Sequence, residues 1–360
     1  MIGSARLAPS FLPATGVLEM TYRCNHRCGF CSCPWYAPGG KYAARPELTA
    51  SEWCAVIDRL TRMGVSNLAF TGGEALLKEG LFDIIRHAAG CTVEHIETRD
   101  GALVSEFKAP NLYLLSNGTA VTPAVLEFCR DHAVQLSMSL PGLTTLREHT
   151  GIGDPDAILG KFSAAKTLGL KTVVNITVTK RNLPELYQTI AAAFLAGAHQ
   201  LLLNRFLPGG RGMEHRDWVL DAAEVREMLA VAEEALTDAG RFGSVGTELP
   251  RCIVDPAKFK RLTIGTRCSA ALGFFVVGPS GLVRVCNHSP VDLVPVAEIE
   301  TLKTHPYWRR FTQRDYLPQQ CGGCALATEC DGGCREAAHV VGGAVDAADP
   351  LLAGCEACGR

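Results

Sequence analysis

The sequence predicts an α/β fold, a partial (β/α)6 TIM-type barrel followed by a small cysteine-rich domain that contains a β-hairpin. Two observations lead to this prediction. Between about residues 16 and 207, short apolar runs alternate with amphipathic helical segments, as in a parallel sheet with helical crossovers. Beyond residue 250 the pattern changes to closely spaced cysteines around one hairpin. With 360 residues, 47% of them hydrophobic, the chain is long enough for two domains.

The barrel strands are expected at six short apolar runs, namely 16–20, 67–70, 111–115, 135–139, 171–178 and 200–204. The first helix has clear end signals, because Thr49 is a good N-cap, Glu52 completes a capping box and Gly64 ends the periodic segment. Further helices are predicted near 79–88, 122–131, 155–168, 184–196 and 221–238.

Two features interrupt the simple barrel. Alternating residues on both sides of Asp100-Gly101 predict a β-hairpin inserted at 92–108, before the third barrel strand. After the last barrel strand, a helix is expected to cover the edge of the barrel. The resulting division is a barrel over 1–215, a linking helix within 216–250 and a cysteine-rich domain over 251–360.

The composition excludes several classes of partner. The formal net charge is −2, and neither a basic run nor an acidic tail is present, so no nucleic-acid surface is expected. No apolar stretch approaches the roughly twenty residues of a membrane span. The chain starts without an apolar signal core, so a cytoplasmic protein is predicted. In a reducing cytosol, clustered cysteines are expected to bind metal rather than to form disulfides.

The most informative motif is a loop of three cysteines, Cys24, Cys28 and Cys31, directly after the first strand. Iron–sulfur clusters usually have four cysteine ligands, so three thiolates leave one iron free to bind another molecule. Zinc is the alternative, because His26 and Cys33 are close enough to supply a fourth ligand.

This spacing, with Phe30 before the third cysteine, resembles the cluster loop of the radical S-adenosylmethionine (SAM) enzymes. The resemblance implies that the open iron chelates the methionyl group of SAM, and that an electron from the cluster cleaves the sulfonium to give a 5′-deoxyadenosyl radical. Ligands at such barrels lie at the carboxyl ends of the strands.

Three strand ends carry residues that match this cofactor. Gly72 and Gly73 would let the backbone approach a ligand closely, and Glu74 would accept hydrogen bonds from the methionyl ammonium group, as in the family motif. Ser116 and Asn117 suit ribose hydroxyls or the carboxylate, although an ordinary Asn-Gly turn is the alternative.

The fourth strand ends in a position that matches the family serine for the cofactor carboxylate, Ser139. Family members often carry an arginine about ten residues later, where this chain has His149-Thr150-Gly151. Arg147 or Arg205 could replace that arginine. Arg205 follows the sixth strand, and its alternative is a surface loop residue.

The C-terminal cysteines form a second pattern. Its gaps are similar to those of the seven-cysteine SPASM extension of many radical SAM enzymes, whereas zinc ribbons are the alternative. The resemblance implies two auxiliary [4Fe–4S] clusters, and thus three in total. The first would be held by Cys268, Cys286 and Cys334, and the second by Cys321, Cys324, Cys330 and a late cysteine, Cys355 or Cys358, with Cys355 preferred.

The remaining cysteines receive separate predictions. Cys252 is the expected fourth ligand of the first auxiliary cluster; otherwise that cluster has an open iron or Cys252 is a free thiol. Cys33 and Cys252 are also candidate catalytic residues, because a thiol could donate a hydrogen atom to a substrate radical. Cys54 and Cys129 lie on apolar helix faces and are expected in the core. Cys91 has no assignment.

The predicted activity is abstraction of hydrogen from a substrate C–H bond after reductive cleavage of SAM. SPASM enzymes mostly act on ribosomal peptides, so oxidation, crosslinking or epimerisation of a peptide is the leading hypothesis. An external one-electron donor such as flavodoxin or ferredoxin would be needed. About fifteen residues precede the first strand, too few for a peptide-binding domain, so a separate peptide-binding protein would be required.

Two other functions compete with peptide modification. The first is a small-molecule radical SAM dehydrogenase or epimerase acting on a sugar or aminocyclitol. The second is a non-catalytic iron–sulfur electron carrier, for which an open-iron loop with a Gly-Gly-Glu motif would have no use.

Overall fold

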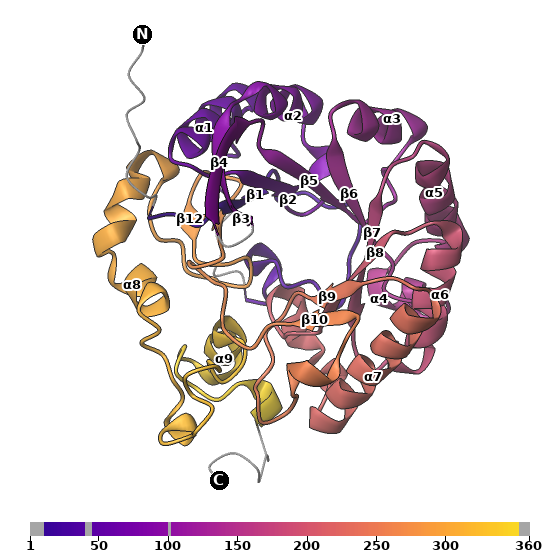
Figure 1. Cartoon of the computed structure of the whole chain (residues 1–360), viewed down its shortest axis with the longest axis vertical. Coiled ribbons are helices and arrows are strands. Elements are labelled where there is room, and N and C mark those ends of the chain that lie inside the picture. The colour runs from indigo at the N-terminus through magenta and orange to yellow at the C-terminus, as the bar shows by residue number, and fades with distance from the viewer. Residues whose placement is uncertain (1–10, 40–44, 100–101, 353–360) are drawn as a thin grey trace.

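The computed structural model describes residues 11–39, 45–99 and 102–352 of the chain (Figure 1). All six predicted barrel strands are present and pair in parallel in one sheet. They are β1 (Thr15–Glu19), β2 (Asn67–Thr71), β5 (Asn111–Ser116), β6 (Val134–Ser139), β7 (Thr172–Val178) and β8 (Gln200–Arg205). Their alternate buried side chains explain why the apolar runs in the sequence located them.

The sheet continues beyond these six strands at both edges. Beyond β8 lie β9 (Gly243–Val245) and β10 (Leu262–Ile264), and beyond β1 lie β11 (Phe274–Val277) and β12 (Val283–Arg284). The C-terminal hairpin is therefore β11–β12, and β11 pairs in parallel with β1, with Thr15 opposite Phe274. Strands on both sides of residue 251 thus belong to one ten-stranded sheet.

Helices cover the outside of this sheet (Figure 1). The predicted ones are α1 (Ala50–Arg62), α2 (Leu81–Gly90), α3 (Pro123–Asp131), α5 (Pro155–Thr167), α6 (Leu186–Ala196) and α7 (Ala222–Asp238). The capping box of α1 is confirmed, since Thr49 accepts from the Glu52 amide and Glu52 from the Thr49 amide. Three short helices were not expected, α4 (Leu146–Thr150), α8 (Pro306–Thr312) and α9 (Arg335–Gly342).

Several 3-10 turns connect these elements. They lie at Pro34–Tyr36, Ala75–Leu77, Leu183–Glu185, Gly210–Glu214, Arg216–Trp218, Pro256–Lys258, Val296–Thr304, Gln319–Cys321 and Pro350–Leu352.

The inserted hairpin is confirmed as β3 (Val93–Arg99) and β4 (Ala102–Lys108), a two-stranded sheet outside the barrel. Its predicted tip, Asp100-Gly101, lies outside the described residues. Large apolar side chains on it are exposed, including Ile96, Leu103 and Phe107. It is the peripheral element that the sequence predicted.

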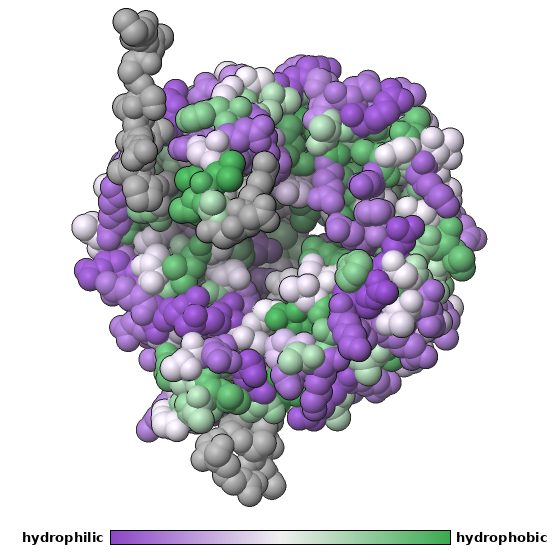
Figure 2. Space-filling view, viewed as in Figure 1, coloured by the Kyte–Doolittle hydropathy of each residue, from purple (hydrophilic) through white to green (hydrophobic). Residues whose placement is uncertain are grey.

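The core is largely one hydrophobic cluster that extends from the barrel into the C-terminal region. Figure 2 shows hydrophilic and hydrophobic residues interspersed over one face of the molecule, which is hollowed near the centre of the barrel. A buried ion pair also crosses the sheet, because Arg284 on β12 contacts Glu19 at the end of β1. Within the described part of the chain, no helix has the length and apolarity needed to cross a membrane.

Candidate cofactor and iron–sulfur site

A cavity of about 320 Å³ lies at the carboxyl ends of the barrel strands. It brings together cysteines that are 310 positions apart in the sequence, since both Cys24 and Cys334 line it. The predicted site residues in its wall are Cys24, Cys28, Cys31, Cys33, Gly72, Gly73, Glu74, Ser116, Asn117, Ser139, Arg205, Cys268, Cys286 and Cys334. Cysteines from the N-terminal loop and from the C-terminal region therefore face one space.

The three-cysteine loop follows β1 and presents its thiols to this cavity. Burial raises the pKa of Cys28, and the nearby Cys31 and Cys24 add to this effect because thiolates repel one another. Burial also raises the pKa of Cys24. Three neighbouring, largely buried thiols fit a metal cluster. The positive charge of its iron would offset the cost of burying the thiolates and the repulsion between them.

Arg211 supports the same loop from the segment after β8. Its Nη1 donates to the Cys28 carbonyl at 3.1 Å, and its guanidinium lies 4.6 Å from the centre of the Tyr36 ring. The sequence did not single out this residue. Its position in a glycine-rich loop after a strand end would have been the only signal.

The two glycines after β2 are required for a reason that differs from the prediction. A Cβ on Gly73 would meet the Arg23 carbonyl oxygen at 2.2 Å, and one on Gly72 would meet the Thr21 oxygen at 2.7 Å. The close approach is thus to the backbone that leads into the cysteine loop. Amides in this turn donate to that backbone, from Gly73 to Thr21 at 2.9 Å and from Glu74 to Arg23 at 2.8 Å. The Gly-Gly pair fixes the cysteine loop against β2.

Glu74 is 1% exposed and points into the cavity wall. Its carboxylate accepts the Asn117 amide at 2.8 Å and the Leu76 amide at 3.2 Å. Burial raises the pKa of Glu74, and these hydrogen bonds oppose the rise. A carboxylate has about four acceptor positions. The two amide bonds and a hydrogen bond from the Ser116 side chain therefore leave about one acceptor position for a ligand ammonium group.

Ser116, Asn117 and Ser139 lie at the ends of β5 and β6 and line the cavity as predicted. Asn117 also reaches the cysteine loop, because its Nδ2 donates to Asn25 Oδ1 at 2.7 Å and lies 3.9 Å from Cys24 Sγ. The Asn-Gly turn and the site are thus not alternatives here, since Asn117 takes part in both.

His149 occupies the place of the family arginine, but it has a structural role. Its ring nitrogens contact the Thr145 carbonyl oxygen at 2.9 Å and Thr179 Oγ1 at 2.8 Å, and burial lowers its pKa. Its own carbonyl accepts the Gly29 amide at 2.8 Å, which holds the cysteine loop. Arg147, one proposed replacement, is exposed and is not part of the cavity wall.

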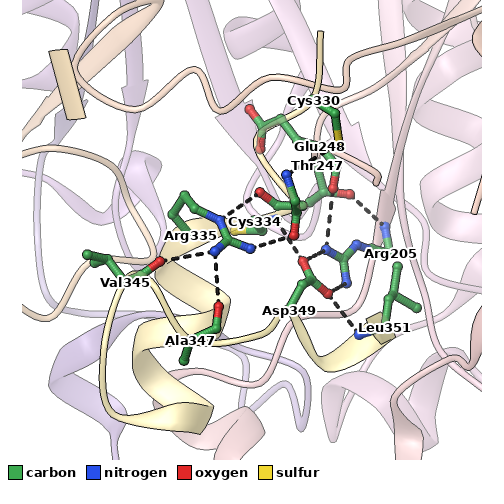
Figure 3. A network of polar contacts seen from close by, with 12 residues as sticks. Arg205, Thr247, Glu248, Cys330, Cys334, Arg335, Val345, Ala347, Asp349 and Leu351 are labelled. Carbon is green, nitrogen blue, oxygen red and sulfur yellow. Dashed lines mark hydrogen bonds and ion pairs between the residues drawn. The ribbon is translucent and has the colours of Figure 1, made fainter. Parts of the chain in front are cut away.

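Arg205, the other proposed replacement, lines the cavity, but its guanidinium binds another partner (Figure 3). Nη1 and Nη2 contact the Asp349 carboxylate at 3.1 and 2.5 Å, and Nη2 also donates to the Glu248 carbonyl. Both side chains of the ion pair are at most 1% exposed. Arg205 is therefore not a surface residue, and its two terminal nitrogens are engaged, whereas Nε has no hydrogen-bond partner among the described residues. The sequence could not show this, because its partner lies 144 residues away.

Cys268, Cys286 and Cys334 form the first C-terminal group, and all three line the cavity. Burial raises the pKa of each thiol, for Cys334 to about 12, and the pKa of Cys286 is raised further by the other two. Backbone contacts to buried carboxylates position this group, from Cys268 N to Asp331 at 2.6 Å and from Cys334 N to Asp349 at 2.7 Å. This donor set fits an iron–sulfur cluster beside the cavity.

Cys321, Cys324 and Cys330 form the second group, away from the cavity wall. Burial raises the pKa of Cys321, and the charges of Cys330, Cys252 and Cys324 add to the rise, so Cys252 lies within electrostatic range of this group. The neighbouring Arg251 explains this position, because its amide donates to Cys330 Sγ at 3.3 Å and its side chain pairs with Glu329. These contacts favour Cys252 as a ligand of this second group over the first.

The two candidate hydrogen donors differ in position. Cys33 lines the cavity and its thiol lies beside Cys31, so that hydrogen bonding between them lowers the pKa of Cys31 and raises that of Cys33. Cys33 therefore keeps its proton. Cys252 is not part of the cavity wall. Cys355 and Cys358 lie outside the described residues.

Polar residues on the last barrel strands also face the cavity, and the sequence analysis missed them. Asn175 and Thr177 alternate on β7, and Asn204 lies near the end of β8. Their only signal was a polar side chain at every second position of an otherwise apolar strand, which marks one face of the sheet. Thr247, Glu248, His288 and Glu336 complete this side of the wall.

Residues 18–193 match the family model described as the radical SAM superfamily. This match identifies a radical SAM domain in the chain. The chain is 23% identical over 352 residues to an AdoMet-dependent heme synthase of Oleidesulfovibrio alaskensis. The aligned region covers 92% of this chain and 85% of the relative. The chain is also 25% identical over 365 residues to a PqqA peptide cyclase of Rhodopseudomonas palustris, covering 97% and 89%.

Solved structures share this fold, and several of them hold S-adenosylmethionine. The structure of Streptococcus suis SuiB bound to precursor peptide SuiA superposes with a TM-score of 0.70 at 13% identity, covering 97% of this chain and 76% of SuiB. The structure of anSMEcpe with bound AdoMet gives a TM-score of 0.66 at 14% identity, covering 89% of each chain. The predicted α/β fold is thus confirmed.

Proposed function

We propose that this enzyme reductively cleaves SAM and abstracts hydrogen from a C–H bond of a ribosomally made peptide, leading to oxidation, crosslinking or epimerisation. The observation that carries the proposal is the single cavity lined by Cys24, Cys28 and Cys31 on one side and by Cys268, Cys286 and Cys334 on the other. A substrate in this cavity would contact both cysteine groups. When bound there, SAM and the clusters supply a carbon radical and the means to exchange single electrons.

The residues of the chain have distinct roles in this proposal. The three-cysteine loop would hold the SAM-binding [4Fe–4S] cluster. Glu74 would accept from the methionyl ammonium group, and Ser116, Asn117 and Ser139 would bind ribose or carboxylate oxygens. The pairing of Arg205 with Asp349 removes it from this set. Buried walls would also exclude water from the reacting atoms.

Two auxiliary clusters are part of the proposal, for a total of three [4Fe–4S] clusters. The first would be held by Cys268, Cys286 and Cys334. The second would be held by Cys321, Cys324 and Cys330, with Cys252 or Cys355 as its fourth ligand. Cys252 is favoured by its place beside Cys321.

Cys33 is the proposed hydrogen donor if the reaction inverts a stereocentre. Its thiol lies at the cavity and keeps its proton. Donation would break S–H and form C–H, and the thiyl left behind would need one electron and one proton. An external one-electron donor such as flavodoxin or ferredoxin would supply the electron.

A peptide substrate is favoured by the relatives, which include PqqA peptide cyclases and a SuiB structure that holds a precursor peptide. A small molecule is the second candidate, because the chain is similarly related to AdoMet-dependent heme synthases. A separate peptide-binding protein would be a further partner if the substrate is a peptide.

Anaerobic reconstitution tests the proposal. The loaded protein should contain about twelve irons, as three four-iron clusters require, and should release 5′-deoxyadenosine when a one-electron donor is added. Candidate precursor peptides and small molecules are then compared for a mass change coupled to that release. About two zinc ions with little iron, or no cleavage of SAM by fully loaded protein, would contradict the assignment.

A further inference from the structure

A second group of possible metal ligands lies outside the cavity, where the outer helices α1 and α2 pack against each other. Asp58 comes from α1, His87 from the last turn of α2, and Cys91 directly follows α2. One ligand atom from each residue lies within 4.8 Å of the other two. His87 Nε2 is 2.7 Å from Asp58 Oδ1, and Cys91 Sγ is 3.7 Å from the same oxygen.

This group is remote from the proposed reaction, since none of its three residues lines the catalytic cavity. Crossover helices run antiparallel to the strands of a (β/α) barrel. The carboxyl end of α2 therefore lies near the amino ends of the strands, opposite the cavity. The three residues cannot serve the cofactor site, so they need a separate explanation.

A half-exposed histidine–carboxylate pair is by itself an ordinary surface contact. Here, however, a thiol approaches the same carboxylate, and all three side chains border a recess of about 410 Å³. The recess also contains Arg62 and Arg86, but Arg86 pairs with Asp83 at 2.5 Å. An ion can thus reach the three donors from solvent.

The donors define the chemical class of the ion. One imidazole nitrogen, one carboxylate oxygen and one sulfur suit a borderline-soft divalent ion and do not suit Mg²⁺ or Ca²⁺, which prefer oxygen. A thiolate and a carboxylate balance its double charge. Three protein donors leave the fourth tetrahedral position to water from the recess.

We propose that Asp58, His87 and Cys91 bind one zinc-class divalent ion. The ion would connect α1 to the end of α2, two residues before hairpin strand β3 begins at Val93. It would thereby fix the base of the exposed hairpin. This site is independent of the iron–sulfur clusters, so its test can fail while the proposed function stands.

The first test measures zinc retention on the cluster-loaded enzyme. Wild-type protein with full iron content is equilibrated anaerobically with isotopically enriched Zn²⁺ and a competing chelator, and zinc and iron are counted by mass spectrometry. About one zinc per chain is expected. His87→Ala and Cys91→Ser should lower the affinity at least about tenfold, since each removes a ligand. His132→Ala, at the C-cap of α3, is the matched control and should retain zinc.

X-ray absorption at the zinc edge of the wild-type enzyme keeps the proposal testable even if a variant fails to fold. One sulfur at about 2.3 Å and nitrogen or oxygen neighbours at about 2.0–2.2 Å are expected. The proposal would be overturned if both variants retained as much zinc as the wild type, or if wild-type protein with full iron content retained none. It would also be overturned if the zinc had three or four sulfur neighbours. The last result would place the zinc in the cluster cysteines.

Discussion

The two cysteine regions that meet at the cavity are held in place by different forces. The N-terminal loop is fixed by backbone hydrogen bonds, because amides of Gly73 and Glu74 donate into it and the Gly29 amide donates to the His149 carbonyl. The C-terminal region is fixed by buried side-chain charges (Figure 3). Arg335, for example, is 0% exposed and donates to the carbonyls of four residues, Gly332, Gly333, Val345 and Ala347.

This difference follows from local structure. The N-terminal loop leaves a parallel strand whose neighbour, β2, sets its register, so main-chain groups find partners directly. The region after β12 contains no strand in its described residues, and therefore its buried carbonyls need side-chain donors. We expect the C-terminal region to depend more on single charged residues, and the N-terminal loop more on its metal ligands.

The largest expected effect is the loss of catalysis when the cysteines of the N-terminal loop are replaced. Replacing Cys24, Cys28 and Cys31 by Ala should abolish 5′-deoxyadenosine formation and lower iron from about twelve to about eight per chain. Chromatographic assay and iron analysis measure both. Cys129→Ala, in the buried core of α3, is the control and should keep both values. A triple variant that still cleaves SAM would show that the active centre lies elsewhere.

The second largest expected effect is a loss of stability when a buried charge of the C-terminal region is removed. Asp349→Ala leaves Arg205 buried without its ion-pair partner, which should lower the free energy of unfolding by about 3–5 kcal/mol. Anaerobic denaturant unfolding measures the change.

The matched control is Asp346→Ala, three residues earlier. Asp346 pairs with Arg310 at 3.3 Å on the surface, so its loss should cost at most about 1 kcal/mol. Similar losses from the two substitutions would remove the distinction between the two regions.

A smaller and more specific effect separates Cys252 from Cys33. Cys252→Ala should lower iron by up to about four per chain or alter the signal of the second auxiliary cluster, because it removes one thiolate ligand. Cys33→Ala should keep about twelve irons. If the reaction inverts a stereocentre, Cys33→Ala should also change the product and remove the solvent deuterium that a thiol donor delivers. If Cys252→Ala keeps its full iron content and cluster signal, Cys355 becomes the expected fourth ligand of the second auxiliary cluster.

The elements that the sequence predicted well are those with a strong local period. Strands of five to seven residues and helices of nine to seventeen residues were predicted within about three residues of their ends. The unpredicted strands β9 and β10 have only three residues each, too few for a period to appear. Their pairing with the barrel depends on long-range contacts.

The site shows the same division. Cys24, Glu74 and Ser139 belong to motifs at strand ends, so topology alone brings them together. The positions of Arg205 and Cys252 depend on residues far along the chain, Asp349 and Cys321, which no strand-end motif or local period connects to them. Residues whose contacts depend on a distant side chain are therefore the ones that the sequence could not place.

The smallest expected effect is a pH dependence from His149. Burial lowers its pKa below 6.5, so between pH 6.5 and the lowered value the unfolded chain binds more protons than the folded protein. Its contribution to stability is present above pH 6.5 and is lost as the pH falls through this window. In the wild type, the free energy of unfolding is expected to fall between pH 7.5 and about 6. His149→Gln keeps a polar group near Thr179 and should make this fall smaller, by at most about 1 kcal/mol. An unchanged decline in His149→Gln would assign it to other groups.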